Sequence, residues 1–312
     1  MADSWLGRTV LGRYKLRKKL GEGGMSVAYL ADGGGHYVVV KLPNVGGPNP
    51  IDICIDKLRV EGEILERIWR QYGGHPNIVK FIDRGDEGQY PVVVEEYVQG
   101  QTLAEYAAGK GGLDPDEAFE IGKRLADVLR FLHSHGIIHS YLAADNVIIR
   151  EADKEPVVDL GIEEFYARII SELNTAVTPC WMPPDWSISG NLYSSSDVYM
   201  WAATLMSVMK PRRCYFTDVC VNFCSYIDYR YALADETCNL VKCGGYVALF
   251  NEVFKAALEV DPTKRVKDGA ELYSLLTGNA AYDPITEMLT KQPANRLRGL
   301  SSAKHVVRRR LK

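Results

Sequence analysis

The residues with the greatest potential for chemistry lie in a loop near the middle of the chain and in a turn that follows it. The loop reads His-Ser-Tyr-Leu-Ala-Ala-Asp-Asn over residues 139–146, and the tripeptide Asp159-Leu160-Gly161 begins thirteen residues after Asn146. An asparagine amide and an aspartate carboxylate supply the oxygen ligands that hard cations such as Mg²⁺ prefer. An unperturbed phenol has a pKa of about 10 and is neutral at pH 7. The two segments therefore offer ligands for a cation, while Tyr141 supplies no general base.

This loop and turn resemble the catalytic loop and the metal-binding turn of protein kinases, whose patterns are H-R-D-L-x-x-x-N and D-F-G. The His, Leu and Asn of the first pattern are present, but Ser140 replaces the Arg and Tyr141 replaces the catalytic Asp. The Lys found two residues later in Ser/Thr kinases is Ala143, and Asp145 stands where tyrosine kinases carry an Arg. The loss of a positioned base typically lowers a rate by about 10²–10⁴. The resemblance thus implies that no catalytic residue is intact, and Ser140 cannot bind an activation-segment phosphate as the family Arg does.

The groups that hold the nucleotide in this family are better represented. The run Gly-Glu-Gly-Gly-Met-Ser over residues 21–26 lies between two strand-like segments, which is typical of a kinase glycine-rich loop and not of a dinucleotide-binding turn. It is similar to the loop of bacterial Ser/Thr kinases. Lys41 ends an apolar run and matches the Lys that contacts the α- and β-phosphates, with Glu61 as its expected partner and Glu63 as the alternative. The positions that the resemblance assigns to the nucleotide are Gly21, Gly23, Ser26, Ala28, Val39, Lys41, Glu61, Glu96, Val98 and Ile148, and those assigned to Mg²⁺ are Asn146 and Asp159.

Two positions that contact adenine in the family are exchanged in size. Ala28 stands where the family has Val, and Val39 stands where it has Ala, so the total volume is preserved, as in the swaps that cores tolerate best. The same comparison puts Glu95 at the gatekeeper position. A buried carboxylate needs a partner or a proton, and Lys41 is the expected partner. These positions favour a nucleotide-binding site that has been retained. The alternative is that the site no longer binds nucleotide and that its residues have changed at random.

The surrounding segments predict an α+β protein with the bilobal fold of protein kinases. A small antiparallel sheet with one main helix, from about Ile55 to Arg70, is expected in the N-lobe. A larger C-lobe is expected to be mainly helical and to contain an amphipathic helix from Asp114 to His135, capped by Asp114 or Asp116. The expected divisions are a lead-in over 1–12, a kinase-like domain over 13–277 with an N-lobe of about 13–96 and a C-lobe of about 100–277, and a C-terminal extension over 278–312.

Three later segments match further kinase patterns in the expected order. Residues 178–185 resemble the end of an activation segment with Pro-Pro-Asp in place of A-P-E, and residues 196–202 resemble D-x-W-x-x-G. Residues 261–265 resemble the stretch that holds a structural Arg. The resemblance implies that Arg265 pairs with Asp185.

Composition is that of a globular chain. The chain has 312 residues, of which 46% are hydrophobic and 25% charged, and its formal net charge is −3. No apolar run reaches the roughly 18 residues that would indicate a transmembrane helix, and the first residues lack the pattern of a signal peptide, so a cytoplasmic location is expected. Residues 291–312 contain eight Lys or Arg and no Asp or Glu. This basic tail could contact an acidic partner or surface, although a solvated tail is the simpler interpretation.

Five of the seven cysteines fall within 30 residues of one another. Their spacing is loose for a zinc site, in which ligands usually occur as pairs two to four residues apart. Free cysteine also packs as a small hydrophobic residue, so zinc is considered but not favoured. The candidate ligands are Cys214, Cys220, Cys224, Cys238 and Cys243.

The prediction that follows is a pseudokinase that binds ATP and Mg²⁺, transfers phosphoryl groups little or not at all, and acts as a scaffold or allosteric regulator of a protein partner. One alternative is an atypically active enzyme, either a weak protein kinase or a nucleotidyl transferase, in which Asp145 or Asp159 supplies the carboxylate. A second alternative is a binding module with an empty nucleotide slot and a C-lobe held by zinc.

Overall fold

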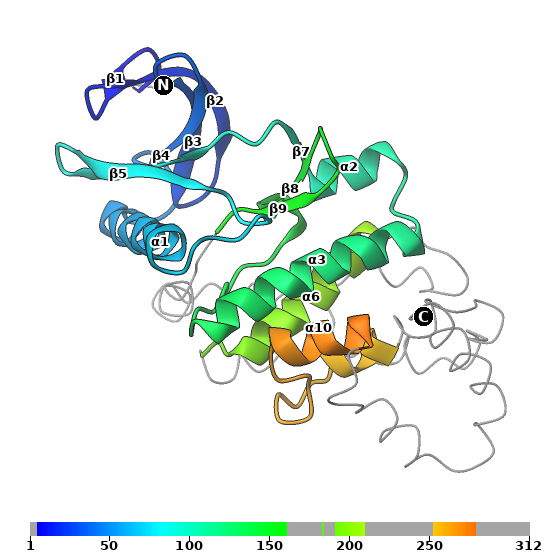
Figure 1. Cartoon of the computed structure of the whole chain (residues 1–312). Helices are drawn as coiled ribbons and strands as arrows, with labels where there is room; N and C mark the ends of the chain where they lie inside the picture. Colours follow the sequence, from blue (N-terminus) through cyan, green and yellow to red (C-terminus); the bar gives the residue numbers. More distant parts are fainter. Residues whose placement is uncertain (1–4, 161–182, 184–190, 210–251, 279–312) are drawn as a thin grey trace, which may run out of the picture.

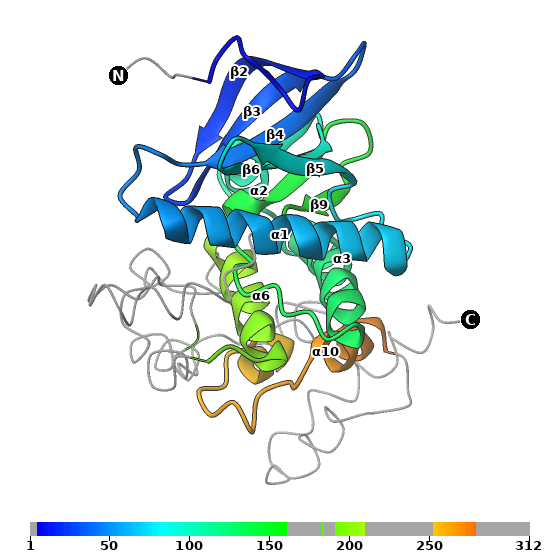
Figure 2. The ribbon, with the colours of Figure 1, turned by 90° about the vertical axis from the view of Figure 1, so that its left-hand side faces the viewer.

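The computed structural model describes residues 5–160, 183, 191–209 and 252–278. These residues form two lobes, with the strands of a twisted sheet in one lobe and most of the helices in the other (Figure 1). Figure 2 shows the long helix α1 (Ile51–Gln71) running across the molecule between the sheet and the helices of the second lobe. The arrangement is the one expected from the sequence.

A six-stranded antiparallel sheet forms the first lobe, with the strand order β1-β2-β3-β4-β6-β5. Buried and exposed residues alternate over the first four residues of β2, from Tyr14 to Arg17, and the rest of the strand is largely exposed. The first strand pairs with β2 and lies within the segment expected to be a lead-in. The strands are β1 (Thr9–Val10), β2 (Tyr14–Glu22), β3 (Ser26–Asp32), β4 (Tyr37–Pro43), β5 (Phe81–Glu87) and β6 (Tyr90–Glu96).

Helix α1 begins at Ile51, four residues earlier than the sequence pattern predicted. Pro50 occupies the N-cap position, where its missing N–H removes no hydrogen bond of the helix. The first turn is held by packing, because Cys54 is fully buried against Met25 of the neighbouring loop. The periodic pattern missed this turn because its buried residue contacts a loop and not the main core.

A small second sheet connects the lobes. It has the order β7-β8-β9, and its strands are β7 (Gly100–Thr102), β8 (Val147–Arg150) and β9 (Pro156–Val158). A short helical turn, η1 (Ala144–Asn146), leads directly into β8. The predicted catalytic loop therefore ends at a strand that is paired on both sides.

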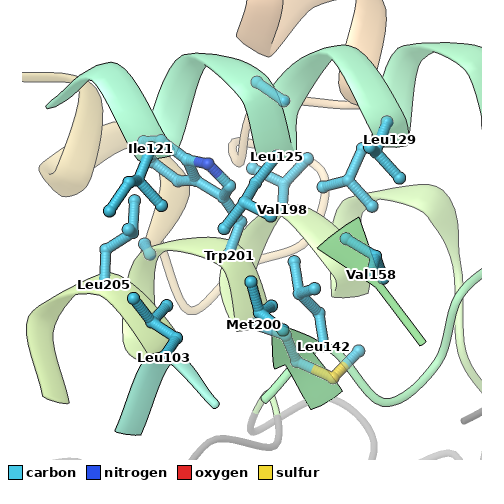
Figure 3. Close-up of a cluster of buried hydrophobic side chains, with 14 of the residues drawn as sticks. Leu103, Ile121, Leu125, Leu129, Leu142, Val158, Val198, Met200, Trp201 and Leu205 are labelled. Carbon is cyan, nitrogen blue, oxygen red and sulfur yellow. The ribbon is translucent and has the colours of Figure 1, made fainter. Parts of the chain in front are cut away.

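Helices α3 (Pro115–Ser134) and α6 (Ser194–Val208) form the centre of the second lobe with α2 (Leu103–Gly109) and α10 (Gly269–Thr277) around them. Asp114 is the N-cap residue of α3, without a side-chain capping hydrogen bond. Figure 3 shows Trp201 of α6 facing Ile121 and Leu125 of α3. The Trp201 side chain is fully buried, and its Nε1 donates to the carbonyl of Gly122 at 2.9 Å.

Two hydrophobic clusters cover the two faces of the six-stranded sheet. The larger cluster contains the core of the second lobe and also Leu65, Phe81 and Val93 from the sheet lobe. The smaller cluster, around Tyr29 and Val40, lies on the other face of the sheet. The lobes thus share one continuous core on the side of the sheet that faces α1.

Several predicted features lie outside the described residues. They include the five clustered cysteines, the end of the predicted activation segment with Asp185, and the basic tail over 291–312. Among the helices that the structure describes, none is both long and apolar enough to cross a membrane.

Candidate nucleotide site

Lys41 lies at the centre of a buried group of three carboxylates. Its Nζ is 2.9 Å from Oε1 of Glu61, 2.5 Å from Oδ1 of Asp159 and 3.2 Å from Oε2 of Glu95. The side chains of Lys41, Glu61 and Glu95 are nearly inaccessible, whereas Asp159 retains 26% of its side-chain exposure. Asp159 is thus the member of the group that faces the open side of the site.

Strand register and helix periodicity bring these side chains together. Lys41 lies opposite Val93 of β6, and Val39 lies opposite Glu95, so Lys41 and Glu95 share one face of the sheet. Asp159 directly follows β9. The sequence named each of these residues, and the contact of Glu95 with Lys41 that it predicted is confirmed, with the sheet register as its physical cause.

The structure also decides between the two candidate glutamates on α1. Glu61 is 3% exposed and bonds Lys41. Glu63 instead lies near Arg84, with Oε1 3.5 Å from that residue's NH1, and its side chain is 60% exposed. Residues two apart on a helix point in very different directions because each residue turns the helix by about 100°. Glu61 is therefore the partner of Lys41.

Charge in this cluster is unbalanced, because one ammonium faces three carboxyl groups. Burial alone would lower the pKa of Lys41, but Asp159, Glu61 and Glu95 together raise it well above its usual value, so Lys41 is charged. Burial, and then the nearby charge of Asp159, raise the pKa of Glu95 well above its usual value, although Lys41 opposes this. Oε2 of Glu95 has Nζ of Lys41 at 3.2 Å as an ion-pair contact, but without the geometry of a hydrogen bond. A protonated Glu95 would relieve the excess negative charge.

The candidate metal ligands are adjacent. The backbone N–H of Asp159 donates to the carbonyl of Asn146 at 2.8 Å. The side-chain Nδ2 of Asn146 donates to the carbonyl of Tyr141 at 2.9 Å, which leaves its Oδ1 as the atom that can face a cation. An amide oxygen and a partly exposed carboxylate next to each other suit Mg²⁺. These residues therefore fit the metal that the sequence implied.

Asp197 of α6 anchors the backbone of the predicted catalytic loop. Its fully buried carboxylate accepts the N–H groups of His139 at 2.7 Å and Ser140 at 2.8 Å, and it contacts Nε2 of His133 at 2.9 Å. Ser140 has φ of 67°, a left-handed conformation that costs a non-glycine residue about 1–2 kcal/mol. The two hydrogen bonds offset this cost. The sequence comparison had located Asp197 but had assigned it no role.

His139 contributes packing and a hydrogen bond to the loop. Burial lowers the pKa of its fully buried imidazole, so the ring is neutral at pH 7. Its Nδ1 accepts the backbone N–H of Tyr141 at 3.3 Å. The loop backbone is thus ordered around Tyr141, whose half-buried side chain stands where the family carries its base.

The predicted adenine contacts line the same side of the sheet as Lys41. Ala28 lies opposite Lys41 and Val39 lies opposite Leu30, which puts both predicted contacts on the Lys41 face. Both side chains are half-buried, as is Ile148 on β8. Val98 is nearly buried after β6, and Glu96 accepts the N–H of Lys80 at 2.9 Å through its side chain.

Arg265 is buried and fixes the chain at the base of α6. Its guanidinium donates to the carbonyls of Glu259 at 2.7 Å, Ser195 at 3.2 Å and Val260 at 3.2 Å. Its predicted partner Asp185 lies outside the described residues. The described partners of Arg265 are backbone carbonyls, and its pairing with Asp185 stays a prediction.

Comparison with protein families finds one domain that covers most of the chain. The Protein kinase domain model matches residues 14–308, which extends past residue 277, where the sequence pattern predicted the domain to end.

Curated relatives include bacterial Ser/Thr kinases. Serine/threonine-protein kinase PrkC of Bacillus subtilis is 28% identical over 211 residues, which cover 66% of this chain and 32% of PrkC. Serine/threonine-protein kinase pkn2 of Myxococcus xanthus is 26% identical over 278 residues, which cover 85% of this chain and 32% of that protein. The chain therefore spans about a third of the length of these relatives.

Solved structures share the fold at low identity. The crystal structure of Rad53 1-466 in complex with AMP-PNP aligns with a TM-score of 0.62 and 18% identity, over 85% of this chain and 66% of that chain. The apo form of PpkA-294 aligns with a TM-score of 0.62 and 16% identity, over 86% of this chain and 98% of that chain. These alignments support the two-lobed fold described above.

Proposed function

This chain belongs to the protein kinase domain family, and on that premise we propose that it is a pseudokinase that holds ATP and Mg²⁺ between its lobes but transfers phosphoryl groups poorly. The kinase fold implies ATP and Mg²⁺ binding, and the Lys41–Glu61 pair that binding requires is present. The observation that carries the proposal is a contrast. The binding residues Lys41, Glu61, Asn146 and Asp159 are all present, whereas Tyr141 stands at the position that the resemblance assigns to the catalytic base. Relatedness to bacterial Ser/Thr kinases is consistent with such an origin.

Each binding residue has a distinct role in this proposal. Lys41 binds the phosphates, and Glu61 keeps its ammonium charged and oriented. Asn146 and Asp159 hold Mg²⁺, which neutralises phosphate charge when bound. Because Asp159 is the exposed member of the buried group, it can exchange its contact with Lys41 for a contact with the metal.

The transfer residues are missing from the same loop. Tyr141 cannot accept the proton of a substrate hydroxyl at neutral pH. Neither Ala143 nor Asp145 supplies a cation for the charge that develops on the transferred group. The loop backbone is nevertheless held by Asp197, so the deficit lies in side chains and not in loop order.

We propose further that the output is regulation of a protein partner in the cytoplasm. ATP would stabilise the closed arrangement of the lobes, and the partner would distinguish the closed state from the open state. The shared core supports such coupling, because residues of α1 and of the sheet pack in the same cluster as α3 and α6.

Nucleotide binding is tested by calorimetric titration of the full chain with ATP, with and without Mg²⁺. We expect binding that Mg²⁺ strengthens and that Lys41→Ala abolishes. Lys264→Ala is the matched control, because that side chain is 71% exposed in the second lobe. Absence of binding to the wild-type chain at millimolar ATP would refute the nucleotide half of the proposal.

Phosphoryl transfer is tested with labelled ATP and a generic protein substrate. We expect little transfer by the wild-type chain and an increase of about 10²–10⁴ in the double variant Tyr141→Asp with Ala143→Lys, because a base and a cation return together. Adding Lys41→Ala should remove the gained activity. Substantial transfer by the wild-type chain, lost in Asp159→Ala, would instead support an atypically active enzyme.

A further inference from the structure

The glycine-rich loop over residues 21–26 is tied to the connector between β4 and α1 by contacts that no sequence pattern predicted. Nδ2 of Asn44 donates to the carbonyl of Gly23 at 2.8 Å and lies 3.2 Å from Oε1 of Glu22. The backbone N–H of Asn44 donates to the carbonyl of Met25 at 2.9 Å. Nδ2 of Asn49 donates to the carbonyl of Gly24 at 2.9 Å. Three consecutive loop carbonyls therefore point at the connector.

The direction of these carbonyls determines the direction of the loop N–H groups. In a planar trans peptide the C=O and the following N–H point in opposite directions. With the carbonyls of Gly23, Gly24 and Met25 held by the connector, the next three N–H groups point away from it. A run of successive N–H groups on one side of a loop forms a concave site for anions. The connector thus fixes the side on which the loop amides are presented.

The fit between loop and connector is close. A Cβ added at Gly24 would lie 2.8 Å from Nδ2 of Asn49, and one added at Gly47 would lie 2.7 Å from the amide of Asn44. Asn44 itself is 4% exposed. Within the loop, the N–H of Gly23 donates to the carbonyl of Ser26 at 2.9 Å and closes the turn. Small residues on both sides therefore allow the amide side chains to reach the loop backbone.

The same contacts link the loop to helix α1. Sγ of Cys54, in the first turn of the helix, lies 3.9 Å from Sδ of Met25 and 4.0 Å from the carbonyl of Gly24. Met25 and Cys54 form a small buried cluster with Ile51 and Ile53 packed against it. Two turns later the same helix carries Glu61, which bonds Lys41. The loop and the Lys41–Glu61 pair are consequently attached to one rigid element.

We propose that Asn44 and Asn49 are positioning residues that hold the glycine-rich loop with its amides directed at the nucleotide phosphates and tie that loop to α1. The inference rests on the proposed function, because it assigns a role within the same nucleotide site. It adds a source of phosphate affinity that lies outside the family's motif. It also predicts that Asn44 and Asn49 act on the phosphates alone and leave the adenine slot unchanged.

The test compares ligands with and without phosphates on the full chain. MgATP, MgADP and adenosine are titrated calorimetrically against wild type, Asn44→Ala, Asn49→Ala and the control Gln71→Ala, whose exposed amide lies at the other end of α1. Each loss of a hydrogen bond should weaken MgATP and MgADP about three- to tenfold. Adenosine affinity should stay within about twofold. Asn49 is the safer variant for folding, because its hydrogen bond is exposed.

Hydrogen exchange of the nucleotide-free protein gives a second readout. The amides of Gly23 and Asn44 are hydrogen-bonded within this contact, so both should exchange faster in Asn49→Ala and not in Gln71→Ala. Equal weakening of MgATP and adenosine, unchanged MgATP affinity, or unchanged exchange would each overturn the positioning role. A wild-type chain that binds adenosine but not MgATP would also overturn it. If the wild-type chain binds none of the three ligands, the proposed function itself fails and this role fails with it.

Discussion

At the scale of single residues, the balance of charge around Lys41 is the most distinctive property of the site. Two carboxylates suffice for the arrangement that the kinase resemblance implies, and Glu95 is a third. Burial and the acidic neighbours raise the pKa of Glu95 well above its usual value, which favours its protonated form in the folded chain. The negative charge that an incoming triphosphate meets is correspondingly smaller than the number of carboxyl groups suggests.

Glu95→Gln should reduce the pH dependence of stability. The raised pKa lets the folded protein keep a proton on Glu95 to a higher pH than the unfolded chain, in which the ordinary value is 4.5. The contribution of Glu95 to stability should therefore be fully present below about pH 4.5 and be lost as the pH rises through the raised folded pKa. Glutamine keeps the shape without the ionisation, so the slope between pH 5 and 8 should be smaller by up to about 1.4 kcal/mol per pH unit. Urea unfolding at several pH values measures how the unfolding free energy of each protein changes with pH.

Glu63→Gln is the matched control for this experiment. It removes a carboxylate from an exposed position on α1 without touching the buried group. Its slope should follow that of the wild type. Identical slopes for Glu95→Gln and wild type would show that Glu95 is not protonated on folding.

At the scale of elements, helix α1 is positioned by how closely it approaches the sheet. Gly62 is buried against β6, and a Cβ at this position would lie 2.7 Å from Cγ2 of Val93. Glu61 is the adjacent residue. The distance between α1 and the sheet therefore sets whether Glu61 reaches Lys41.

Gly62→Ala should destabilise the protein and weaken nucleotide binding. Alanine favours a helix over glycine by about 1 kcal/mol, but overpacking a core costs about 1–3 kcal/mol, and pushing α1 outward separates Glu61 from Lys41. We expect a net loss of about 1 kcal/mol in unfolding free energy, with MgATP affinity reduced.

The control is Gly109→Ala at the end of α2, where a Cβ would meet nothing within 4 Å. That variant should be neutral or slightly stabilised, and its nucleotide affinity should not change. A Gly62→Ala variant as stable as Gly109→Ala would show that α1 has room to move. Both are measured by urea unfolding and by titration.

At the scale of the whole molecule, one core and one buried carboxylate join the parts that make the site. The larger cluster runs from α1 and the sheet into α3 and α6. Asp197 connects α6 both to the predicted catalytic loop and to His133 of α3. The second nitrogen of His133 accepts the N–H of Gly269 at 2.8 Å, which adds α10 to the same network.

Asp197→Ala should cost about 2–6 kcal/mol in unfolding free energy. It leaves the N–H groups of His139 and Ser140 buried without their acceptor, and each such loss costs about 1–3 kcal/mol. Asp197→Asn keeps one side-chain oxygen and should lose less. Asp86→Ala removes only an exposed ion pair with Arg59 and should change stability by at most about 1 kcal/mol. Equal stabilities for Asp197→Ala and Asp86→Ala would contradict the anchoring role.

Much of this architecture could be predicted from the sequence, because it depends on order and periodicity along the chain. The strand-like segments beside the glycine-rich loop and the apolar run before Lys41 predicted strands, and the resemblance supplied the two lobes and the residues of the candidate nucleotide site. Boundaries were less predictable: α1 begins at Ile51 because its first turn packs on Met25, a contact that periodicity does not contain.

The assignment of Tyr141 to the place of the base, and of Ala143 and Asp145 to the places of the missing cations, is a prediction from the sequence alone, because it concerns which side chain stands at one position of a motif. The contacts of Lys41 with Glu61 and Glu95 were predicted from the sequence but depend on helix phase and sheet register, and the tertiary structure confirms both and excludes Glu63 as the partner. The hydrogen bonds from Asn44 and Asn49 to the glycine-rich loop were predicted by no sequence pattern, and only the tertiary structure shows them. Their partners lie about twenty residues away, and only the folded sheet and helix bring the two segments within hydrogen-bonding distance.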